Sequence, residues 1–360
     1  MIPLIILIVI TLGMIAESIL KPSFFKHIVM LFATVCGIIF AFTYYEALAT
    51  VIARIKLVPS SSYAVAFMLL FAISFAILKL LGDFTIRPEV KMPAAFAKAS
   101  SMICSVIFGI LSTGAILVFL SLMPINAKYP YDRLANIGAE KVNSNKCMLN
   151  MDGIVTGIYN MVSSGSFAGK TEFSAVHANF IDNNYLNRAH LSDSVSSLSG
   201  KNAVKLVSEE GAVRKAHTQL KYSGGNLPVQ HPAGKQMYII TVSISQKSIE
   251  SGGIVEDKGG YSFSPGQFRL LSNRNYAKGA KGDTETAYPA GYLDQYRKLT
   301  KFDLANDVID LAGYKQDNKD AVISLAFYVT DGYSPVAVTF RHNVIIKLPK
   351  EAGKEQADTE

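Results

Sequence analysis

Apolar positions are concentrated in the first third of the chain, where charged residues are scarce. Four runs stand out, and they cover Ile2 to Leu20, Ile28 to Ala53, Tyr63 to Leu81 and Ser100 to Met123. A bilayer core of about 30 Å is crossed by about 20 mostly apolar residues in a helix. A helix of a water-soluble protein shows one apolar stripe and one charged face, whereas these runs hold very few charges and have no charged face. We therefore expect a four-helix membrane domain over residues 1–125.

Polar residues dominate after Pro124, and short elements are expected there. The stretch "MDGIVTGIYNMVSSGSFAG" places Ile154, Ile158 and Met161 on one helical face before a Ser-Gly run ends the pattern. We interpret residues 126–234 as a linker with short helices that packs near the membrane surface.

A period of two begins near Lys235. In "MYIITVSIS" and "VISLAFYVT" apolar residues alternate with polar ones, and "VAVTF" and "VIIKL" repeat the theme. One-sided strands separated by turn residues such as "TDGYSP" predict an antiparallel β-sandwich over residues 235–350. The charged tail, residues 351–360, is expected to be disordered. The predicted fold class is thus an all-α four-helix membrane domain followed by a mainly-β soluble domain.

The basic residues of the short loops indicate an orientation. The first and third loops carry Lys21, Lys26, Arg87, Lys91 and Lys98, while the second has Arg54 and Lys56. Because Lys and Arg are enriched in cytoplasmic loops, the N-terminus and the part after Met123 are expected on the other side of the membrane. No basic residue precedes the first run and no small-x-small site closes it, so a retained anchor is expected rather than a signal peptide.

Small residues recur four apart on one face of the fourth run. In lipid, such a row lets two helix backbones approach closely. The predicted packing seam consists of Ser101, Ser105, Gly109 and Thr113, with a shorter version at Gly37 and Ala41 in the second run. It indicates a compact bundle or an oligomer contact.

Two carboxylates lie within or near the runs. Ionisable residues inside a membrane are functional candidates because burying their charge is costly. Glu17 lies near Lys21 at a predicted helix end and is interpreted as part of an interfacial pair. Glu46 is deeper, beside Tyr44 and Tyr45, and is either a headgroup-level residue or a polar site that faces the bundle interior.

The sequence carries none of the common catalytic or metal-binding patterns. The six histidines are dispersed without ligand spacing, and no nucleophile elbow, P-loop or dinucleotide fingerprint occurs. The three cysteines make no disulfide framework. The formal net charge of +7 comes from scattered lysines rather than a basic stripe with aromatics, which argues against nucleic acid. We predict no enzyme, no cofactor and no metal.

The membrane domain resembles the colicin V production (CvpA) family. "SVIFGILSTGAILVFL" is similar to the family's last span, with Ser105 and Thr113 in place of outer glycines. "YAVAFMLLFAISFAILKLL" resembles its third span through Phe67 and Phe71, and "TVCGIIFAF" its second. The first run departs from the family, because "GMIAESILKPS" replaces a Gly-Arg-Gly-like segment. The resemblance implies an inner-membrane protein linked to toxin export and envelope physiology.

The C-terminal part resembles extracytoplasmic immunoglobulin-like sandwiches. The resemblance lies mainly in "LAFYVTDGYSPVAVTF", Leu325 to Phe340. Three functions remain open. The first is a colicin V production type protein that supports toxin secretion or envelope organisation. The second is an oligomeric channel or transporter component, and the third a membrane-anchored ligand-binding or sensor protein. The expected partners are membrane lipids and either further copies of the chain or another envelope protein.

Overall fold

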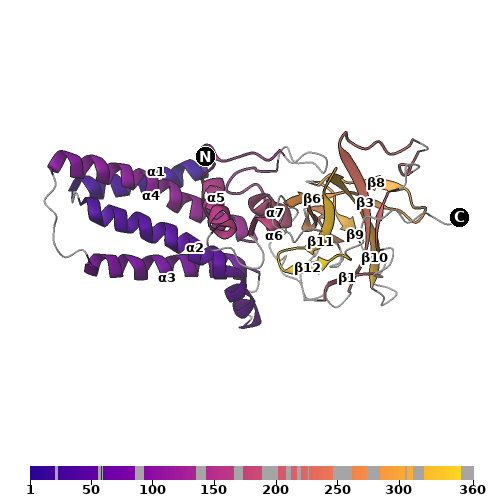
Figure 1. Ribbon diagram of the computed structural model, residues 1–360, viewed down its shortest axis with the longest axis horizontal. Coiled ribbons are helices and arrows are strands. Elements are labelled where there is room, and N and C mark those ends of the chain that lie inside the picture. Colours follow the sequence, from indigo (N-terminus) through magenta and orange to yellow (C-terminus); the bar gives the residue numbers. More distant parts are fainter. Residues whose placement is uncertain are drawn as a thin grey trace. The chain divides into compact units, whose positions relative to one another are not determined.

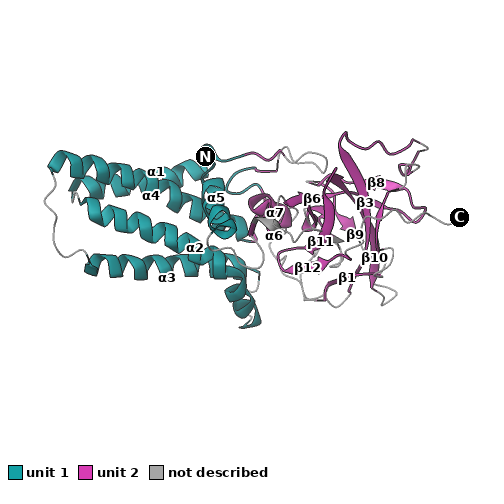
Figure 2. Ribbon diagram, viewed as in Figure 1, with its two compact units in different colours: residues 1–123, 128–132, 146–168 teal, residues 124–127, 133–145, 169–360 magenta. Residues whose placement is uncertain are grey.

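The chain forms two compact units in the computed structural model (Figure 2). Unit 1 comprises residues 1–123, 128–132 and 146–168, and unit 2 comprises residues 124–127, 133–145 and 169–360. The structure describes residues 1–20, 23–55, 58, 60–85, 93–134, 143–165, 173–188, 202–207, 212–216, 220–225, 227–245, 262–274, 284–304, 306–310 and 320–349.

Unit 1 contains four long helices, each long and apolar enough to cross a membrane. They are α1 (Ile2–Leu20), α2 (Phe24–Ile55), α3 (Ser62–Thr85) and α4 (Ala94–Leu122). The expectation of four apolar helices in this part of the chain is confirmed, and this composition is that of a membrane protein. The basic residues used for orientation at positions 21, 56, 87 and 91 lie outside the described residues.

The four helices pack as two pairs, α1 beside α4 and α2 beside α3, with α2 also touching α4 (Figure 1). Aromatic rings join the second pair. The rings of Phe42 and Phe67 lie edge to face with centroids 5.1 Å apart, and those of Tyr45 and Tyr63 lie 5.8 Å apart. Edge-to-face geometry is the arrangement that aromatic quadrupoles favour. The α2–α3 contact is thus built from rings, whereas the α1–α4 contact is built from small residues.

A further helix, α5 (Met151–Ser164), follows the short helix η1 (Met148–Asn150) and belongs to unit 1. It packs on α4 and α2. Its buried side includes Val155 and Tyr159, and the Tyr159 ring stacks on Phe42 with centroids 4.9 Å apart. The predicted helix is present, but the face with Ile154, Ile158 and Met161 points away from the bundle.

Unit 2 is mainly antiparallel β-sheet, as expected for the C-terminal part. Two short helices, α6 (Phe173–Val176) and α7 (Phe180–Asn187), precede the strands. The strands are β1 (Val204–Leu206), β2 (Val213–Lys215), β3 (Lys235–Ile244), β4 (Ser262–Phe263), β5 (Phe268–Asn273), β6 (Thr284–Ala287), β7 (Pro289–Leu293), β8 (Leu299–Lys301), β9 (Ile309–Asp310), β10 (Ala321–Thr330), β11 (Ser334–Phe340) and β12 (Val344–Lys347). The short helix η3 (Pro265–Gln267) leads into β5.

The described strands form two larger sheets and one small ribbon. One sheet has the order β1-β3-β10-β7-β8, with β2 also paired to β3, and the other has the order β12-β11-β5-β6. β4 pairs with β9. The longest pairing joins β3 and β10 without a break, from Ala321 opposite Ile244 to Thr330 opposite Lys235. Within it, the hydroxyls of Thr241 and Ser324 lie 2.8 Å apart.

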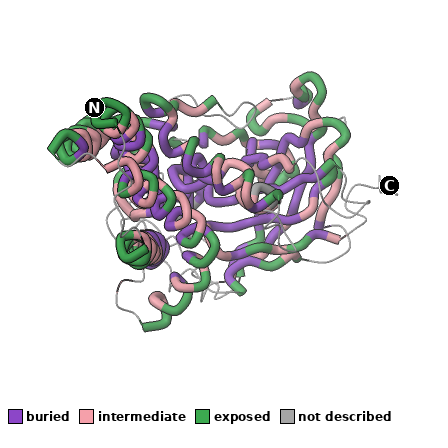
Figure 3. Tube along the Cα trace, turned by 60° about the vertical axis from the view of Figure 1, so that its left-hand side comes forward, coloured by how far each residue is buried: buried purple, intermediate pink, exposed green. Residues whose placement is uncertain are grey.

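One hydrophobic cluster is shared by the two larger sheets. β3 and β10 contribute Ile240, Val242, Leu325 and Phe327, and each is buried completely. From the other sheet, Phe268 of β5 and Phe340 of β11 pack ring against ring with centroids 4.4 Å apart. The predicted alternation places these residues on one face, because successive side chains of a strand point to opposite sides. The Cα tube of Figure 3 accordingly shows long buried stretches in the strand-rich part of the chain.

The opposite face of β3 and β10 is buried as well. Ile239 and Tyr328 belong to a second cluster with Val229 and Leu299. The Tyr328 hydroxyl donates to the carbonyl of Gln230 at 3.4 Å. Residues before β3 therefore cover a face that the alternating pattern assigns to solvent, and Tyr328 is a core residue despite its hydroxyl.

The segment interpreted as a linker, residues 126–234, contributes to both units. Residues 128–132 and 146–168 join unit 1, and the rest join unit 2, including β1 and β2. β1 and β2 pair with β3, so the sheet begins well before Lys235. The tail, residues 351–360, lies outside the described residues.

Candidate functional site

Helix α7 is unusual because its polar side chains are buried. Its sequence, "FIDNNYLN", buries Asp182, Asn183, Asn184 and Asn187 together with its apolar residues. The helix packs against η3, where a side chain at Gly266 would collide with Leu186. Close approach at this glycine brings the asparagines next to β5. Buried amides need hydrogen-bond partners, and Asn183 and Asn187 find theirs in Tyr288, Arg269 and His342.

Arg269 of β5 is the principal partner of this helix. Its side chain is only 5% exposed. One terminal nitrogen donates to Asn187 Oδ1 at 3.3 Å, the Nε donates to Thr339 Oγ1 at 3.1 Å, and the other terminal nitrogen donates to the carbonyl of Arg341. The arginine therefore ties α7 to β5 and to the end of β11.

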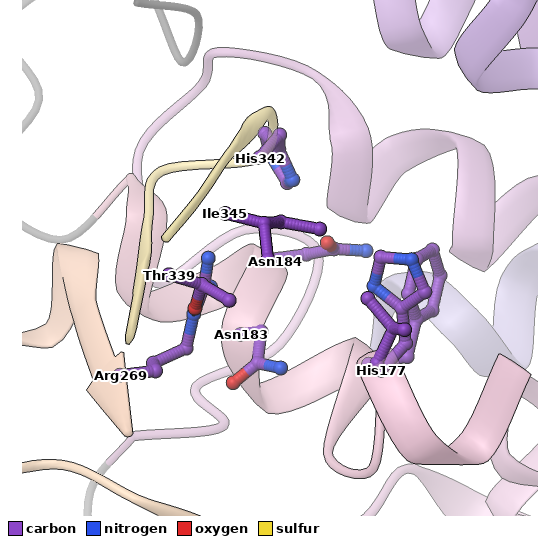
Figure 4. A pocket seen from close by; sticks show the side chains of 9 residues that line it. His177, Asn183, Asn184, Arg269, Thr339, His342 and Ile345 are labelled. Atoms are coloured by element: carbon purple, nitrogen blue, oxygen red, sulfur yellow. The ribbon is translucent and has the colours of Figure 1, made fainter. Parts of the chain in front are cut away.

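Arg269 lines a pocket within unit 2, which we call the Arg269 pocket (Figure 4). Its polar lining consists of His177, Asn183, Asn184, Arg269, Thr339 and His342. Val176, Phe180 and Ile345 supply the apolar part. The cavity between these side chains has a volume of about 20 Å³, on the scale of one water molecule, and it is partly open to solvent. The lining comes from α6, α7, β5, β11, β12 and the turns beside them, so segments far apart in sequence meet here.

Several charged side chains are buried in unit 2. The buried side chains described in unit 2 include four arginines, Arg133, Arg188, Arg269 and Arg341, but a single carboxylate, Asp182. Asp182 accepts a hydrogen bond from Arg133 Nε at 2.5 Å, so its charge is already matched. Burying an ion costs several kcal/mol unless another charge compensates it. Arg269, the arginine at the pocket, forms its hydrogen bonds to uncharged oxygens of Asn187, Thr339 and Arg341.

Burial acts on the arginines through desolvation. It lowers the pKa of Arg269 to about 10, and it lowers that of Arg341 to about 10 as well. Both side chains therefore keep their charge at neutral pH, although less tightly than in water. Tyr288, whose hydroxyl donates to Asn183 Oδ1 at 2.7 Å, has its pKa raised by burial and then by the charge of Asp182. It stays a neutral donor that positions Asn183.

The arrangement is suited to holding an anion. Guanidinium, amide and hydroxyl groups all donate hydrogen bonds, and charge-assisted bonds to carboxylate or phosphate are about twice as strong as neutral ones. A bound anion would also offset the buried positive charge. Among the described residues no group of three His, Cys, Asp or Glu side chains is placed to hold a metal.

The predicted packing seam lies inside unit 1. Gly109 faces Thr11 of α1, and the Ser105 hydroxyl donates to Ser101 O at 2.8 Å and to Met14 O at 3.4 Å. Ser101 and Thr113 are fully buried. In α2, Ala41 is buried, and the added side chain of a substituted Gly37 would meet Phe71 of α3 at 3.3 Å. The row therefore joins helices of one chain.

The two carboxylates predicted as polar sites lie in different surroundings. Glu46 is half-buried on α2 and accepts a hydrogen bond from the buried Tyr45 hydroxyl at 2.9 Å. Glu17 is exposed on α1. The structure does not bring the two together at a common site.

A compact polar cluster in unit 1 surrounds Asp152, at the start of α5. Its carboxylate accepts hydrogen bonds from Tyr131 Oη at 2.5 Å, from the Cys147 thiol at 3.3 Å and from the Gly153 amide at 2.9 Å. Burial, followed by the charge of Asp152, raises the pKa of Cys147 to about 11. A thiol that stays protonated is a poor nucleophile, so Cys147 is not suited to catalysis. The hydrogen bonds of the cluster instead stabilise the first turn of α5. All three cysteines lie in described segments, and they form no disulfide.

The Arg269 pocket was not predicted from the sequence. Two signals were present, namely an arginine inside an otherwise apolar strand in "GQFRLLS" and the basic pair of "TFRHN" directly after another strand. A charged residue at a core position needs a buried partner. The identity of that partner depends on α7, which lies about 80 residues earlier and whose position only the fold defines.

Comparisons of the chain with protein-family models, with curated proteins and with solved structures give no match. The resemblances to the colicin V production family and to immunoglobulin-like sandwiches therefore remain predictions from the quoted residues.

Proposed function

We propose that the chain is a membrane-anchored binding protein whose β-rich unit takes a small anionic ligand in the Arg269 pocket. The observation that carries the proposal is the buried guanidinium of Arg269, whose hydrogen bonds go to uncharged oxygens, at a pocket lined by hydrogen-bond donors. An anion beside this guanidinium would compensate its charge, which favours the occupied pocket. The proposal corresponds to the ligand-binding or sensor function left open by the sequence.

The size and lining of the pocket define the ligand class. The cavity of about 20 Å³, partly open to solvent, restricts the proposal to a small anion that binds at the opening. Arg269 already uses three of its hydrogen bonds within the protein, so the ligand also relies on the amides and on Thr339. A phosphate or a short carboxylate meets these conditions.

The test is anion binding by the full chain in nanodiscs. Phosphate and succinate are titrated by calorimetry, with chloride at equal ionic strength as the reference. We expect saturable binding, and we expect Arg269→Met to weaken it at least tenfold. Lys205→Met serves as the matched control, because Lys205 is an exposed cation on β1 that does not belong to the lining. Absence of binding by both anions in the folded chain would overturn the proposal.

A second variant tests the pocket even if Arg269→Met does not fold. His177 is only half-buried, so His177→Ala should leave the fold intact while removing one wall of the pocket. Reduced phosphate affinity with an unchanged unfolding temperature supports a binding site. Unchanged affinity in both variants points to binding elsewhere.

We further infer that unit 1 anchors the protein in the inner membrane with unit 2 outside the cytoplasm. This rests on the loop charges and on the resemblance to the colicin V production family. The same resemblance supports a role in toxin secretion or envelope organisation. A cell that produces colicin V but lacks this chain should then release less toxin, and normal release would argue against that role.

We propose an immunoglobulin-like arrangement for the two sheets of unit 2. Support comes from the "LAFYVTDGYSPVAVTF" segment, which forms β10 and β11, and from the cluster that both sheets share. β10 and β11 lie in different sheets, as successive strands of such sandwiches often do. An experimental structure of unit 2 with a different strand order would contradict this assignment.

A further inference from the structure

Helix α5 presents an apolar face to its surroundings. Ile154 is 39% exposed and Met161 is 71% exposed, and Met148 and Leu149 of η1 are exposed beside them. The one charged residue of the helix, Asp152, is 1% exposed and points inward. Amphipathic helices in water place polar residues outward, so this pattern is reversed.

The same helix is held against the membrane-crossing helices. A side chain at Gly114 of α4 would overlap the backbone of Met151 and would lie 2.6 Å from Val155 Cγ2. Gly114 therefore lets the α5 backbone lie directly on α4. On the other side, Tyr159 stacks on Phe42 of α2, and its hydroxyl lies 3.3 Å from Thr43 Oγ1.

These contacts define the depth of α5. Gly114 lies eight residues before the end of α4 at Leu122, which corresponds to about 12 Å along a helix. Phe42 likewise lies within the apolar stretch of α2 rather than at its end. Helix α5 therefore meets the bundle at the level of the apolar segments.

We propose that α5 lies in the lipid interface, with Ile154, Ile158 and Met161 inserted among the acyl chains. Lipid is the occupant favoured by the structure because α5 packs on α4 and α2, and beside its contact with Phe42 the α2 side chain of Phe40 is apolar and half exposed. Burying an apolar helix face at the boundary between the headgroups and the acyl chains is favourable in proportion to its apolar area. Unit 1 thus has four crossing helices and a fifth that lies on the membrane.

The loop before α5 fits this placement. Leu149 and Asn150 both have positive φ, at 59° and 47°. An L-residue, and a leucine in particular, adopts this conformation only where the surroundings impose it. The turn leaves the Leu149 side chain exposed next to Met148 while Asp152 stays inside. Insertion of Leu149 and Met148 into lipid accounts for an exposed leucine in a strained turn.

Fluorescence quenching tests the proposal. The chain contains no tryptophan, so a single introduced tryptophan reports one position. Three variants are compared in liposomes: Met161→Trp, Ile103→Trp on the outside of α4, and Tyr296→Trp in an exposed turn of unit 2. Brominated lipids quench a tryptophan in the bilayer, and acrylamide quenches one in water.

We expect lipids brominated near the headgroups to reduce the tryptophan fluorescence of Met161→Trp at least twofold. Brominated lipids should also reduce the fluorescence of Ile103→Trp. Acrylamide should have little effect on either variant. Tyr296→Trp should show the reverse. Acrylamide quenching of Met161→Trp to the level of Tyr296→Trp would overturn the proposal. Protection from both quenchers would also overturn it, since protein rather than lipid would then cover the face. Adding Gly114→Leu should displace α5 and reduce the lipid quenching.

Discussion

Gly109 of α4 lies so close to Thr11 of α1 that the threonine occupies the space a side chain at position 109 would need. One turn away, the Ser105 hydroxyl donates to the carbonyl of Met14. The small residues thus mark the line where two helix backbones approach. Since lipid provides little hydrophobic drive for helix association, this close packing holds α1 on the bundle.

Gly109→Leu should therefore destabilise unit 1. Overpacking of a closely packed contact costs about 1–3 kcal/mol. We expect a clear fall in the unfolding temperature in mild detergent, followed by circular dichroism. The matched control is Gly13→Leu on α1, because nothing lies within 4 Å of the added side chain. Equal effects of the two substitutions would contradict the seam.

Replacing Arg133 should lower the free energy of unfolding, because a buried carboxylate then lacks its partner. Arg133→Met leaves Asp182 without its partner, and breaking a buried pair from one side costs about 3–5 kcal/mol. Denaturant unfolding measures this loss. The double variant Arg133→Met with Asp182→Leu should recover most of it, because no uncompensated charge remains. If both variants are equally unstable, packing rather than charge is responsible.

Truncating Phe327, in the core between the two larger sheets, should destabilise unit 2. Phe327→Ala leaves a cavity at a position that is fully buried, with an expected cost of about 3–5 kcal/mol. Val322→Ala on the same strand, where the side chain is 44% exposed, should cost less than about 1 kcal/mol. Chemical denaturation of the two variants compares them directly. Similar losses would show that β10 is not buried as described.

Anion binding should weaken in alkali. The pKa of Arg269 is lowered by burial to about 10, so below that pH the folded side chain is charged and the affinity is at its full value. As pH rises through about 10, the folded arginine loses its proton while the unfolded one keeps it. Phosphate affinity should therefore fall across this range, whereas the contribution of this group to the free energy of unfolding rises. Calorimetric titration at pH 8 and at about pH 10.5 checks the first effect.

Arg269→Met provides the reference for this pH series. Any phosphate binding that it retains should not show the loss that the parent chain shows near pH 10. A parent affinity that stays constant across the range would mean that Arg269 does not contact the anion.

Protease access should report the orientation. Trypsin added to spheroplasts should cleave unit 2 if it lies outside the cytoplasm, as the loop charges predict. Inverted membrane vesicles should protect it. The opposite pattern would place unit 2 in the cytoplasm.

The helices and strands were largely predictable because each depends on a local property. The length of an apolar run decides whether it can cross a membrane, and α1 coincides with the run from Ile2 to Leu20. The alternation of Ile240 and Val242 with polar neighbours likewise predicted β3. The burial of Tyr328 was not predicted, because it depends on the segment around Val229 that covers it.

The sequence by itself determined where the apolar helices lie, which strand faces form the shared core, and where small residues permit close helix contact. Only the tertiary structure decided which helix Gly109 meets, which way α5 turns its apolar face, and where Arg269 finds its partners. The physical reason is the range of the interactions. Hydrophobic periodicity is set by neighbouring residues, whereas Arg269 is stabilised by Asn187 and Thr339, which are near it only in the folded chain.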